Sequence, residues 1–398
     1  MSKDMRGRVA GRDRLVADAV HAAQYLESMG CPRPVIMAYN PVARVNTYSA
    51  LMYSRLWQRG IAPLPLFQIA DLDALCPLMA DLGIRIVLHQ QWTSDILRNA
   101  TSESDAMAKS ADFVGLLDRF LGAGGRMVWT VHNVLSHDAP FPAIEAAMQQ
   151  EIADRAQAIH VLTSGTVQAT AEWFRIPPEK TTHIPHPNYV GSYPDIISRD
   201  QARYDLDLLP DEVVYSFIGA IKPYKGLEQL LDAFDIVRRD GRPRRLLVAG
   251  IPGTDPATEA LLDRCLLHPY VVLHPAIVPD NELQYYLRAA DVAVLPYQRS
   301  LNSGVLMLAL SFGLPLVAPQ SPSSMEIVTP AVARTFQPGN AESLTAALAA
   351  ADELITPAAR SEAERVARSF APGPLAEQFA ALIDQVTAEQ ALDAVSRS

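Results

Sequence analysis

The sequence predicts an α/β protein with two doubly wound domains and a helical C-terminal tail. Short apolar runs alternate with helix-like segments almost throughout, which is typical of parallel sheets covered by helices on both faces. The length of 398 residues exceeds what one hydrophobic core usually fills and therefore favours two domains. The alternation is interrupted by the proline-rich stretch 184–203, which indicates a linker.

The first domain is expected to span residues 1–190. Apolar runs predict its strands at 34–39, 62–67, 84–89, 125–132 and 158–163. Helix-like segments lie between or after them, near 47–59, 71–82, 107–121, 142–156 and 164–174. Helical connections of this length bring each strand back in the same direction, so we expect a parallel sheet.

The second domain is expected to span residues 191–370. Its strands are predicted at 213–221, 244–250, 270–275, 291–297 and 314–319, with helices between them. The last 60 residues read as helical. We expect residues 371–398 to form a helix that packs back towards the N-terminal domain.

Composition and charge narrow the function. Apolar residues make up 49% and charged residues 20%, which indicates a soluble globular protein. The net charge of −10 argues against nucleic acid as the main partner. Residues 1–60 nevertheless carry a net +5, against −15 for the rest of the chain. This basic segment is either a solvated face or a weak attachment to anionic lipid, and both readings stay open.

The three cysteines, Cys31, Cys76 and Cys265, are far apart and show neither metal nor redox spacing. No apolar segment follows the basic N-terminus as a signal peptide would require. We therefore expect a cytoplasmic protein, either free or peripheral at the inner face of the membrane, with no metal site. The apolar run 300–319 is too short for a membrane helix, because Gly313 and Pro315 interrupt it.

Ligands of doubly wound sheets bind beyond the carboxyl ends of the strands. In the second domain these ends carry cations, glycines, polar side chains and the start of an apolar helix. The residues are Gly219, Lys222, Lys225, Gly253, Tyr297, Ser300, Asn302, Ser303 and Gly304. Such a set suits a diphosphate, whereas a solvated turn and an ordinary helix cap are the alternatives. Neither GxxxxGK[ST] nor GxGxxG occurs, which disfavours nucleoside triphosphatases and standard nicotinamide dehydrogenases.

Four segments carry a family resemblance: GAIKPYKGLEQLLDAF, LLVAGIPG, LRAADVAVLPY and SGVLMLALSFGLPLVAP. Over about 213–330 they resemble the donor half of bacterial GT-B glycosyltransferases, of the family 4-like type that builds exopolysaccharides and other surface glycans. NPVARVNTYSALMYSRLWQRG and TVHN resemble the acceptor domain more weakly. The resemblance implies two Rossmann-like domains facing a cleft, and a metal-independent, hexosyltransferase-type enzyme.

The resemblance also implies roles for individual residues. Lys225 would bind the donor diphosphate, together with the backbone N–H groups of Ser303, Gly304 and Val305. The family's usual Glu-x7-Glu positions fall here on Ser300 and Leu308, and its usual arginine falls on Ala220. Lys222 could substitute for that arginine, and Glu326 could reach the ribose.

In the first domain, His132 and Asn133 lie at the end of a predicted strand, and Asp138 lies shortly after them. Asn133 is assigned to the acceptor site. His132 could accept the proton of an acceptor hydroxyl or hydrogen-bond the sugar, with Asp138 as the rival base. The alternative is a histidine that only caps the strand. Four further residues at strand ends or at the first helix are assigned to the acceptor site: Arg44, Asn46, His89 and Trp92. Core packing is the alternative for Trp92, and His186 at the junction reads as structural.

These observations predict a glycosyltransferase that passes a sugar from a nucleotide-diphosphate donor to a hydroxyl of a glycan or lipid-linked acceptor. The partners are then the nucleotide sugar and this acceptor, without nucleic acid and without a cofactor. Two alternatives stay open. One is a sugar-nucleotide epimerase or phosphorylase on the same fold. The other is a non-catalytic scaffold, which the missing glutamates favour.

Overall fold

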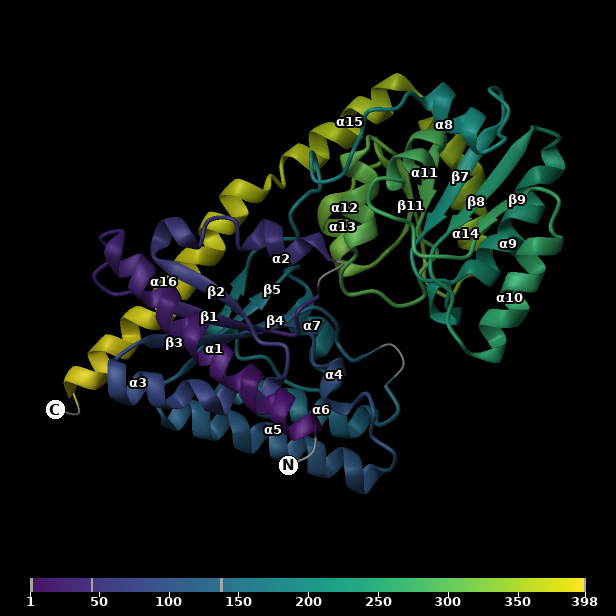
Figure 1. Ribbon diagram of the computed structural model, residues 1–398. Helices are drawn as coiled ribbons and strands as arrows, with labels where there is room; N and C mark the ends of the chain where they lie inside the picture. Colours follow the sequence, from purple (N-terminus) through teal and green to yellow (C-terminus); the bar gives the residue numbers. More distant parts are fainter. Residues whose placement is uncertain (1–2, 44–45, 137–138, 397–398) are drawn as a thin grey trace. The chain divides into compact units, whose positions relative to one another are not determined.

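The computed structural model describes residues 3–43, 46–136 and 139–396 (Figure 1). The chain divides into two compact units, of which unit 1 comprises Met1–Pro185 with Pro372–Ser398 and unit 2 comprises His186–Ala371. Each unit holds a six-stranded parallel sheet with surrounding helices. The predicted fold class is therefore confirmed. Within the described residues no helix is long and apolar enough to cross a membrane.

Unit 1 alternates strands and helices as the sequence predicts. Its strands are β1 (Val35–Asn40), β2 (Ile61–Pro65), β3 (Arg85–Gln90), β4 (Arg126–Val131), β5 (Ala158–Val161) and β6 (Thr181–His183). Its helices are α1 (Lys3–Ser28), α2 (Thr47–Met52), η1 (Trp57–Arg59), η2 (Ile69–Leu75), α3 (Cys76–Leu82), α4 (Ser94–Leu97), α5 (Glu103–Gly122), α6 (Pro142–Arg155), α7 (Thr166–Thr170), η3 (Pro178–Lys180) and α16 (Pro372–Ser396). The sequence analysis did not predict α1 or β6.

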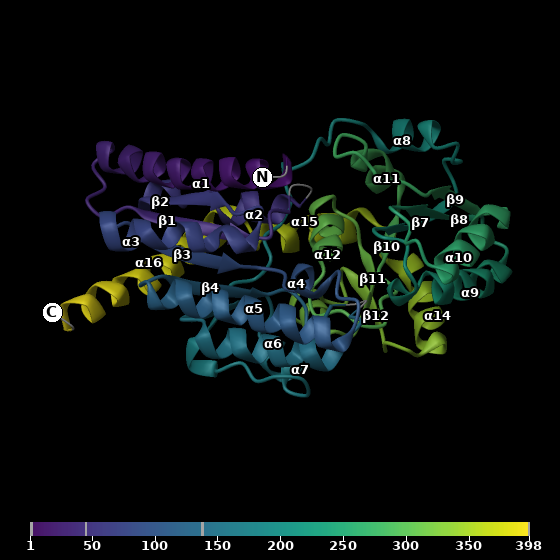
Figure 2. The same ribbon diagram turned by 60° about the horizontal axis from the view of Figure 1, so that its bottom comes forward.

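The sheet of unit 1 has the strand order β2-β1-β3-β4-β5-β6. The order reverses between β1 and β3, so the crevice at their carboxyl ends is the expected ligand position. Helices α5 and α6 pack on each other and on β4 (Figure 2). The strands are apolar on both faces because both faces are covered: Ile36, Met37 and Val87 have no exposed surface.

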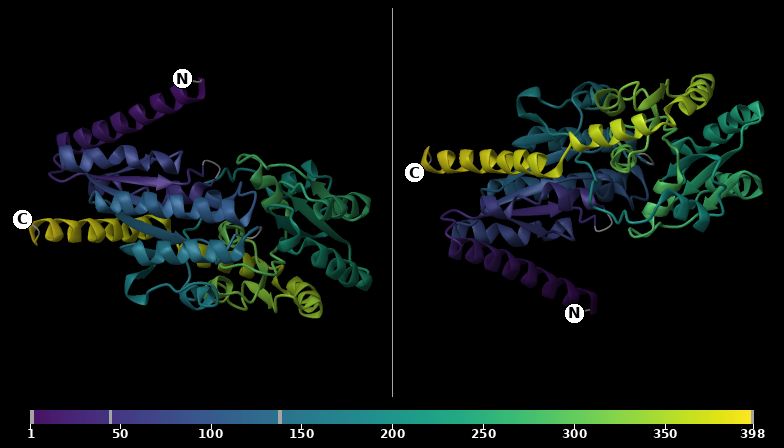
Figure 3. Two further views of the ribbon diagram at one scale, coloured as in Figure 1. Left: turned by 90° about the horizontal axis from the view of Figure 1, so that it is seen from below. Right: turned by 90° about the horizontal axis from the view of Figure 1, so that it is seen from above.

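Helix α16 belongs to unit 1, although it follows the whole of unit 2 in the sequence. It contacts α2, β3 and β4, and it runs beside the elements of residues 1–185 (Figure 3). Its Phe379 is fully buried, with ring centroids 4.8 Å from His89 and 5.6 Å from His160. An apolar helix stripe is thus used to close the core of a sheet formed by much earlier residues.

Unit 2 has the strands β7 (Val213–Ile218), β8 (Arg244–Ala249), β9 (Val271–His274), β10 (Val292–Val294), β11 (Leu316–Pro319) and β12 (Ala333–Phe336). Its helices are α8 (Arg199–Asp205), η4 (Pro223–Lys225), α9 (Leu227–Val237), η5 (Arg238–Asp240), α10 (Pro256–Leu267), α11 (Leu283–Ala289), α12 (Gly304–Ser311), α13 (Pro322–Ile327), α14 (Ala341–Ala350), η6 (Ala351–Leu354) and α15 (Pro357–Arg368). The sheet order is β12-β11-β10-β7-β8-β9, so the order reverses between β7 and β10.

The boundary between the units lies slightly earlier than predicted, after Pro185 instead of after residue 190. Asn188 donates its backbone N–H to Phe370 O at 2.8 Å and its side chain to Ala367 O at 2.7 Å. Tyr189 donates its backbone N–H to Ser311 Oγ at 2.9 Å. These bonds tie the proline-rich stretch to unit 2, which composition alone does not reveal.

A buried ion pair fixes α8 to the sheet of unit 2. Arg203 and Asp291 are 1% and 2% exposed, and Arg203 Nη2 lies 2.7 Å from Asp291 Oδ2. That same oxygen accepts the backbone N–H of Val214 on β7 at 2.9 Å. Since each charge is paired and hydrogen-bonded, the burial of both is tolerated.

Candidate functional site

Two glycines bring the loops of unit 2 together at the switch point between β7 and β10. Gly226, with φ +74, follows η4, and a Cβ at this position would lie 2.0 Å from Pro296 O. Gly250 has φ +152, and its Cβ would lie 1.8 Å from Gly219 O. Neither position can hold a side chain without movement of the backbone, so both glycines are needed for this close approach.

Lys225, at the end of η4, rests on aromatic rings. Its Nζ lies 3.9 Å from the ring centroid of Tyr297 and 5.4 Å from that of Tyr224. Among the described residues no carboxylate forms an ion pair with it. Burial lowers the pKa of Lys225 to about 8, because desolvation disfavours the charged ammonium. The amine is therefore a cation without a counter-anion, held in place by the rings.

The first turn of α12 lies beside this lysine loop. Ser303 caps the helix and accepts the backbone N–H of Leu306 at 3.2 Å. Val305 Cγ2 lies 3.8 Å from the position that a Cβ on Gly219 would take, which places the helix start next to the end of β7. The N-terminus of α12 and the Lys225 loop thus meet at one edge and can hold an anion together.

His186 lies at the same helix start, although the sequence analysis read it as structural. A Cβ on Gly304 would lie 3.5 Å from His186 Nε2 and 3.2 Å from Tyr189 Oη. His186 Nδ1 donates to Pro187 O at 2.7 Å, and burial lowers the pKa of His186 to about 4. A neutral imidazole therefore borders the α12 N-terminus, and the motif IPHP was the signal that could have indicated it.

Other residues assigned to the donor have local roles in the structure. Lys222 precedes η4, and its Cγ lies 3.4 Å from where a Cβ on Gly253 would stand. Ser300 donates its hydroxyl to Asn302 O at 2.9 Å. Glu326 is exposed on α13. Their donor roles stay predictions.

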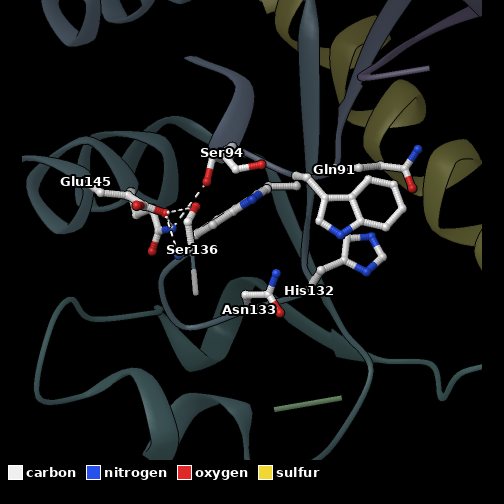
Figure 4. Close-up of a pocket in the computed structure, with 10 residues that line it drawn as sticks. Gln91, Ser94, His132, Asn133, Ser136 and Glu145 are labelled. Carbon is white, nitrogen blue, oxygen red and sulfur yellow. Dashed lines mark hydrogen bonds between the residues drawn. The ribbon is translucent and has the colours of Figure 1, made fainter. Parts of the chain in front are cut away.

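Unit 1 contains a small hollow, partly open to solvent, beyond the carboxyl ends of β3 and β4 (Figure 4). It is lined by Gln91, Trp92, Thr93, Ser94, Trp129, His132, Asn133, Ser136, Glu145 and Gln149. Trp92 and His132 stack with ring centroids 4.0 Å apart and planes 12° apart. Tyr48 meets the edge of the stack at 5.1 Å from His132. These contacts hold the imidazole in one orientation.

The opposite side of the hollow is polar, as Figure 4 shows for Glu145 and Ser136. Glu145 Oε1 accepts the backbone N–H of Ser136 at 2.8 Å and the Ser136 hydroxyl at 2.7 Å. Gln149 Nε2 donates to the same oxygen at 3.3 Å and to Thr93 Oγ1 at 3.2 Å. The carboxylate therefore ties helix α6 to the loop after β4.

The structure brings some of the predicted acceptor-site residues together and places others elsewhere. Trp92, His132 and Asn133 line the hollow together, so the structure brings them to one place. Asn46 caps α2, where its side chain accepts the backbone N–H of Tyr48 at 2.9 Å. Arg44 and Asp138 lie outside the described residues. Roles in acceptor binding stay predictions for all of these residues.

The assignment of His89 to the acceptor site is wrong. His89 is fully buried, and its ring nitrogens are hydrogen-bonded to Tyr53 Oη at 2.6 Å and Thr130 Oγ1 at 2.7 Å. Desolvation, with a smaller contribution from nearby His160, holds the pKa of His89 well below its usual range. The side chain points into the core beneath Phe379 instead of towards a ligand.

Sequence reasoning missed the polar side of the hollow. Glu145 and Gln149 are 3% and 2% exposed, and they lie one helical turn apart on α6. The sequence PAIEAAMQQE places both on the apolar face of the helix, and polar residues on a buried face are a signal for a site. The described residues contain no group of three His, Cys, Asp or Glu that could hold a metal ion.

Comparison with known proteins gives a family match that lies entirely within unit 2. Residues 212–351 match the family model described as "Glycosyl transferases group 1". These residues form a group 1 glycosyltransferase domain. The predicted resemblance to glycosyltransferases is thereby confirmed, whereas the exopolysaccharide type remains a prediction.

Two curated glycosyltransferases are also similar to this chain in sequence. The chain is 30% identical to the GDP-mannose:glycolipid 4-beta-D-mannosyltransferase of Xanthomonas campestris pv. campestris, over 61% of this chain and 63% of that protein. It is 30% identical to the D-inositol 3-phosphate glycosyltransferase of Rhodococcus erythropolis, over 46% and 42%. The chain thus spans less than two thirds of the length of these relatives.

Two solved structures share the fold of both units. The sucrose-phosphate synthase of Thermosynechococcus elongatus aligns over 90% of this chain and 100% of its own, with a TM-score of 0.68 and 16% identity. Anabaena HepE, solved in complex with UDP and glucose, aligns over 89% and 100%, with a TM-score of 0.65 and 14% identity. The fold is that of GT-B glycosyltransferases, as expected from the sequence.

Proposed function

We propose that the protein transfers a glycosyl group from a nucleoside diphosphate sugar, bound by unit 2, to a hydroxyl group of a glycan or lipid-linked acceptor, bound by unit 1. The convergence of Lys225 and the α12 N-terminus at the switch point of a group 1 glycosyltransferase domain carries this proposal. An amine without a counter-anion and a capped helix start both favour a diphosphate.

In the proposed reaction the bond between the anomeric carbon and the diphosphate oxygen breaks. The acceptor oxygen bonds to the anomeric carbon, and the acceptor proton passes to a base of unit 1. Lys225, Lys222 and the first N–H groups of α12 offset the charge that grows on the leaving diphosphate. We propose that these groups are sufficient without a metal ion, so that chelation with EDTA leaves transfer unchanged.

His132 is the proposed base, with Asp138 as the rival. The stack with Trp92 and the edge contact with Tyr48 hold the His132 ring at the hollow, where an acceptor hydroxyl could approach it. His132→Ala is expected to abolish transfer while nucleotide affinity is kept. Loss of nucleotide binding in this variant would contradict the division of labour between the units.

GDP-mannose is the first donor to test, because the mannosyltransferase relative is named for it, and UDP-glucose is the second, because HepE structures contain UDP and glucose. A glycolipid is the first acceptor class for the same reason. Peripheral attachment to an anionic membrane is part of this proposal. Exposed Tyr25 and Trp57, with ring centroids 6.0 Å apart, and the basic first 60 residues support it.

The decisive experiment is calorimetric titration of the full chain with GDP-mannose, UDP-glucose, ADP-glucose and dTDP-glucose. We expect one nucleotide sugar to bind, and Lys225→Ala to weaken it by about 10- to 100-fold, the usual cost of losing a charge-assisted hydrogen bond. Arg239→Ala is the matched control, since this exposed cation lies after the far end of α9. If no nucleotide sugar binds, the non-catalytic alternative gains and the transferase proposal fails.

Membrane attachment has its own test, because transfer does not depend on it. Flotation with vesicles of phosphatidylcholine and phosphatidylglycerol should carry the protein upward at low salt and release it at high salt. Absence of flotation at low salt would remove this part of the proposal and leave the transfer reaction untouched.

A further inference from the structure

The hollow of unit 1 holds two side-chain oxygens that accept no hydrogen bond from the residues that the structure describes. Glu145 Oε1 receives both bonds from Ser136 and the bond from Gln149, and no donor among the described residues reaches Oε2. Gln149 Oε1 is buried and has no hydrogen-bond partner among the described residues, while the Nε2 of the same amide donates twice. The amide orientation is fixed by these two bonds, so its oxygen is the free end.

Buried acceptors without donors are rare, because each loses its hydration without replacement. Among the described residues Gln149 Oε1 is such a buried acceptor, whereas Glu145 Oε2 is not among the buried atoms and is open to solvent in the hollow. Both side chains line the same hollow. They lie on neighbouring turns of α6, so one ligand can meet both. A ligand in the hollow that offers two neighbouring donors would satisfy Gln149 Oε1 and could also bind Glu145 Oε2.

The charge of the hollow restricts what that ligand can be. Its described lining contains one carboxylate, from Glu145, and neither lysine nor arginine. A phosphate or carboxylate placed here would face Glu145 without a compensating cation, which is unfavourable in a partly buried site. A neutral molecule rich in hydroxyl groups meets both requirements, since each hydroxyl can donate to one free acceptor.

Trp92 supplies the third element. Its indole lines the hollow opposite the polar side chains and is held by its stack with His132. A rigid aromatic surface beside polar groups suits a sugar ring, which has apolar C–H faces and a polar rim.

We propose that this hollow binds an uncharged pyranose unit of the acceptor, with two ring hydroxyls donating to Glu145 Oε2 and Gln149 Oε1 and with the ring beside Trp92. The proposal rests on the proposed function and names its acceptor class. The site discriminates against uronic acids and phosphorylated sugars. Glu145 and Gln149 are positioning residues in this scheme, and the proton acceptor remains a separate group.

The test is binding of defined sugars to the full chain, without donor, followed by calorimetry and ligand-observed NMR. The probes are methyl β-D-glucopyranoside, methyl α-D-mannopyranoside and methyl β-cellobioside, against methyl β-D-glucopyranosiduronate and glucose 6-phosphate. We expect at least one neutral glycoside to bind about tenfold or more tightly than either anionic sugar. Equal or tighter binding of the anionic sugars overturns the proposal, and so does saturable binding of none of the neutral glycosides.

Substitutions in the hollow test whether the neutral glycoside binds there. Glu145→Gln is expected to weaken the neutral glycoside by about tenfold and to reduce the discrimination against the uronate, because it removes the charge and keeps the shape. Gln149→Leu should weaken binding several-fold and leave the discrimination intact. Glu151→Gln is the matched control, since Glu151 lies on the same helix with an exposed side chain beside Arg155.

Folding and function are controlled separately. Each variant is compared with the parent protein by thermal unfolding, and a folded Glu145→Gln variant with unchanged sugar affinity and selectivity overturns the proposal. If Glu145→Gln does not fold, Gln149→Leu and the selectivity of the parent protein still decide it. Nucleotide binding without neutral-sugar binding would sink this inference alone, whereas sugar binding without nucleotide binding would sink the proposed transferase and leave the hollow's ligand class in place.

Discussion

The two units build their candidate sites at equivalent places but with opposite chemistry. Both use the carboxyl edge of a parallel sheet near the point where strand order reverses. Unit 2 places an amine, glycines and a helix N-terminus there, and unit 1 places a stacked indole and imidazole facing one carboxylate. The difference shows that the fold fixes the position of a site, whereas the loops decide the charge of its ligand.

The variant with the largest expected effect tests whether the two units unfold independently of each other. Phe379→Ala should destabilise unit 1 by about 3–5 kcal/mol, because it removes a fully buried ring from above His89 and His160. Differential scanning calorimetry should show the unit 1 transition lowered, with nucleotide binding by unit 2 kept.

Phe234→Ala on α9, also fully buried, is the reciprocal variant and should lower the unit 2 transition by a similar amount. Nucleotide then identifies the transitions, since it stabilises the unit that binds it. If both variants shift both unfolding transitions equally, the two units unfold as one and cannot be treated as independent.

Acid should weaken both units through histidines whose pKa is lowered in the folded protein. In the unfolded chain a histidine becomes protonated below about pH 6.5, whereas His186 stays neutral until about pH 4 in the folded protein. The unfolded state therefore binds more protons between these values, and stability falls as the pH decreases through this window. At pH 5 protonation of His186 in the unfolded chain lowers the free energy of unfolding by about 2 kcal/mol.

His89 acts in the same direction in unit 1, since its pKa is also lowered by burial. Chemical denaturation at pH 7, 6 and 5 measures the loss in each unit. His186→Gln should flatten the pH dependence of unit 2 only. A variant that retains the full acid sensitivity of unit 2 would assign the effect to other groups.

Nucleotide affinity should decrease in alkali because of Lys225. The free protein loses the ammonium charge as the pH rises through about 8, and a bound diphosphate favours the charged form. Below pH 8 the affinity should be nearly constant, and above it the affinity should fall by up to about tenfold per pH unit. Calorimetry from pH 7 to 9.5 measures this, with Lys225→Ala as the variant that should lack the dependence.

The smallest effect sharpens the role of the aromatic support. Tyr297→Leu removes the ring 3.9 Å from Lys225 Nζ, and a partly buried cation–π contact contributes about 0.5–2 kcal/mol. Nucleotide affinity should decrease by a few-fold, less than for Lys225→Ala. A loss as large as that of Lys225→Ala would show that Tyr297 itself contacts the donor.

The proximity of candidate residues was easier to predict in unit 2 than in unit 1, for a physical reason. Lys225 and the Ser303–Gly304 turn lie in short motifs that determine the local backbone geometry, although their donor roles stay predictions. The hollow depends on contacts over long sequence distances, such as Trp92 with His132 and Thr93 with Gln149. His89 was assigned wrongly because the residue that covers it, Phe379, lies at the other end of the chain.

Secondary structure shows the same limit. Strands buried on both faces were predicted from their apolar runs, and β12 and β6 were missed because they are short, at four and three residues, and only partly apolar. Helix α1 was missed because its many charged residues obscure the apolar positions, such as Leu15, Ala19 and Leu26, that pack on unit 1. Glu145 and Gln149 on α6 are polar residues on a buried helix face, and their place in a site was recognised only once the structure showed the hollow that they line.

The position of α16 determines the order in which the protein can be assembled during translation. Unit 2 is continuous in sequence, so all its residues leave the ribosome together, whereas unit 1 lacks the segment that covers His89 and His160 until residues 372–388 have been made. Until then the face of the sheet under Phe379 is exposed to chaperones and proteases. Unit 1 is therefore the last part of the chain to become native, and a nascent chain stalled after residue 371 has left the ribosome would have a complete unit 2 before a complete unit 1.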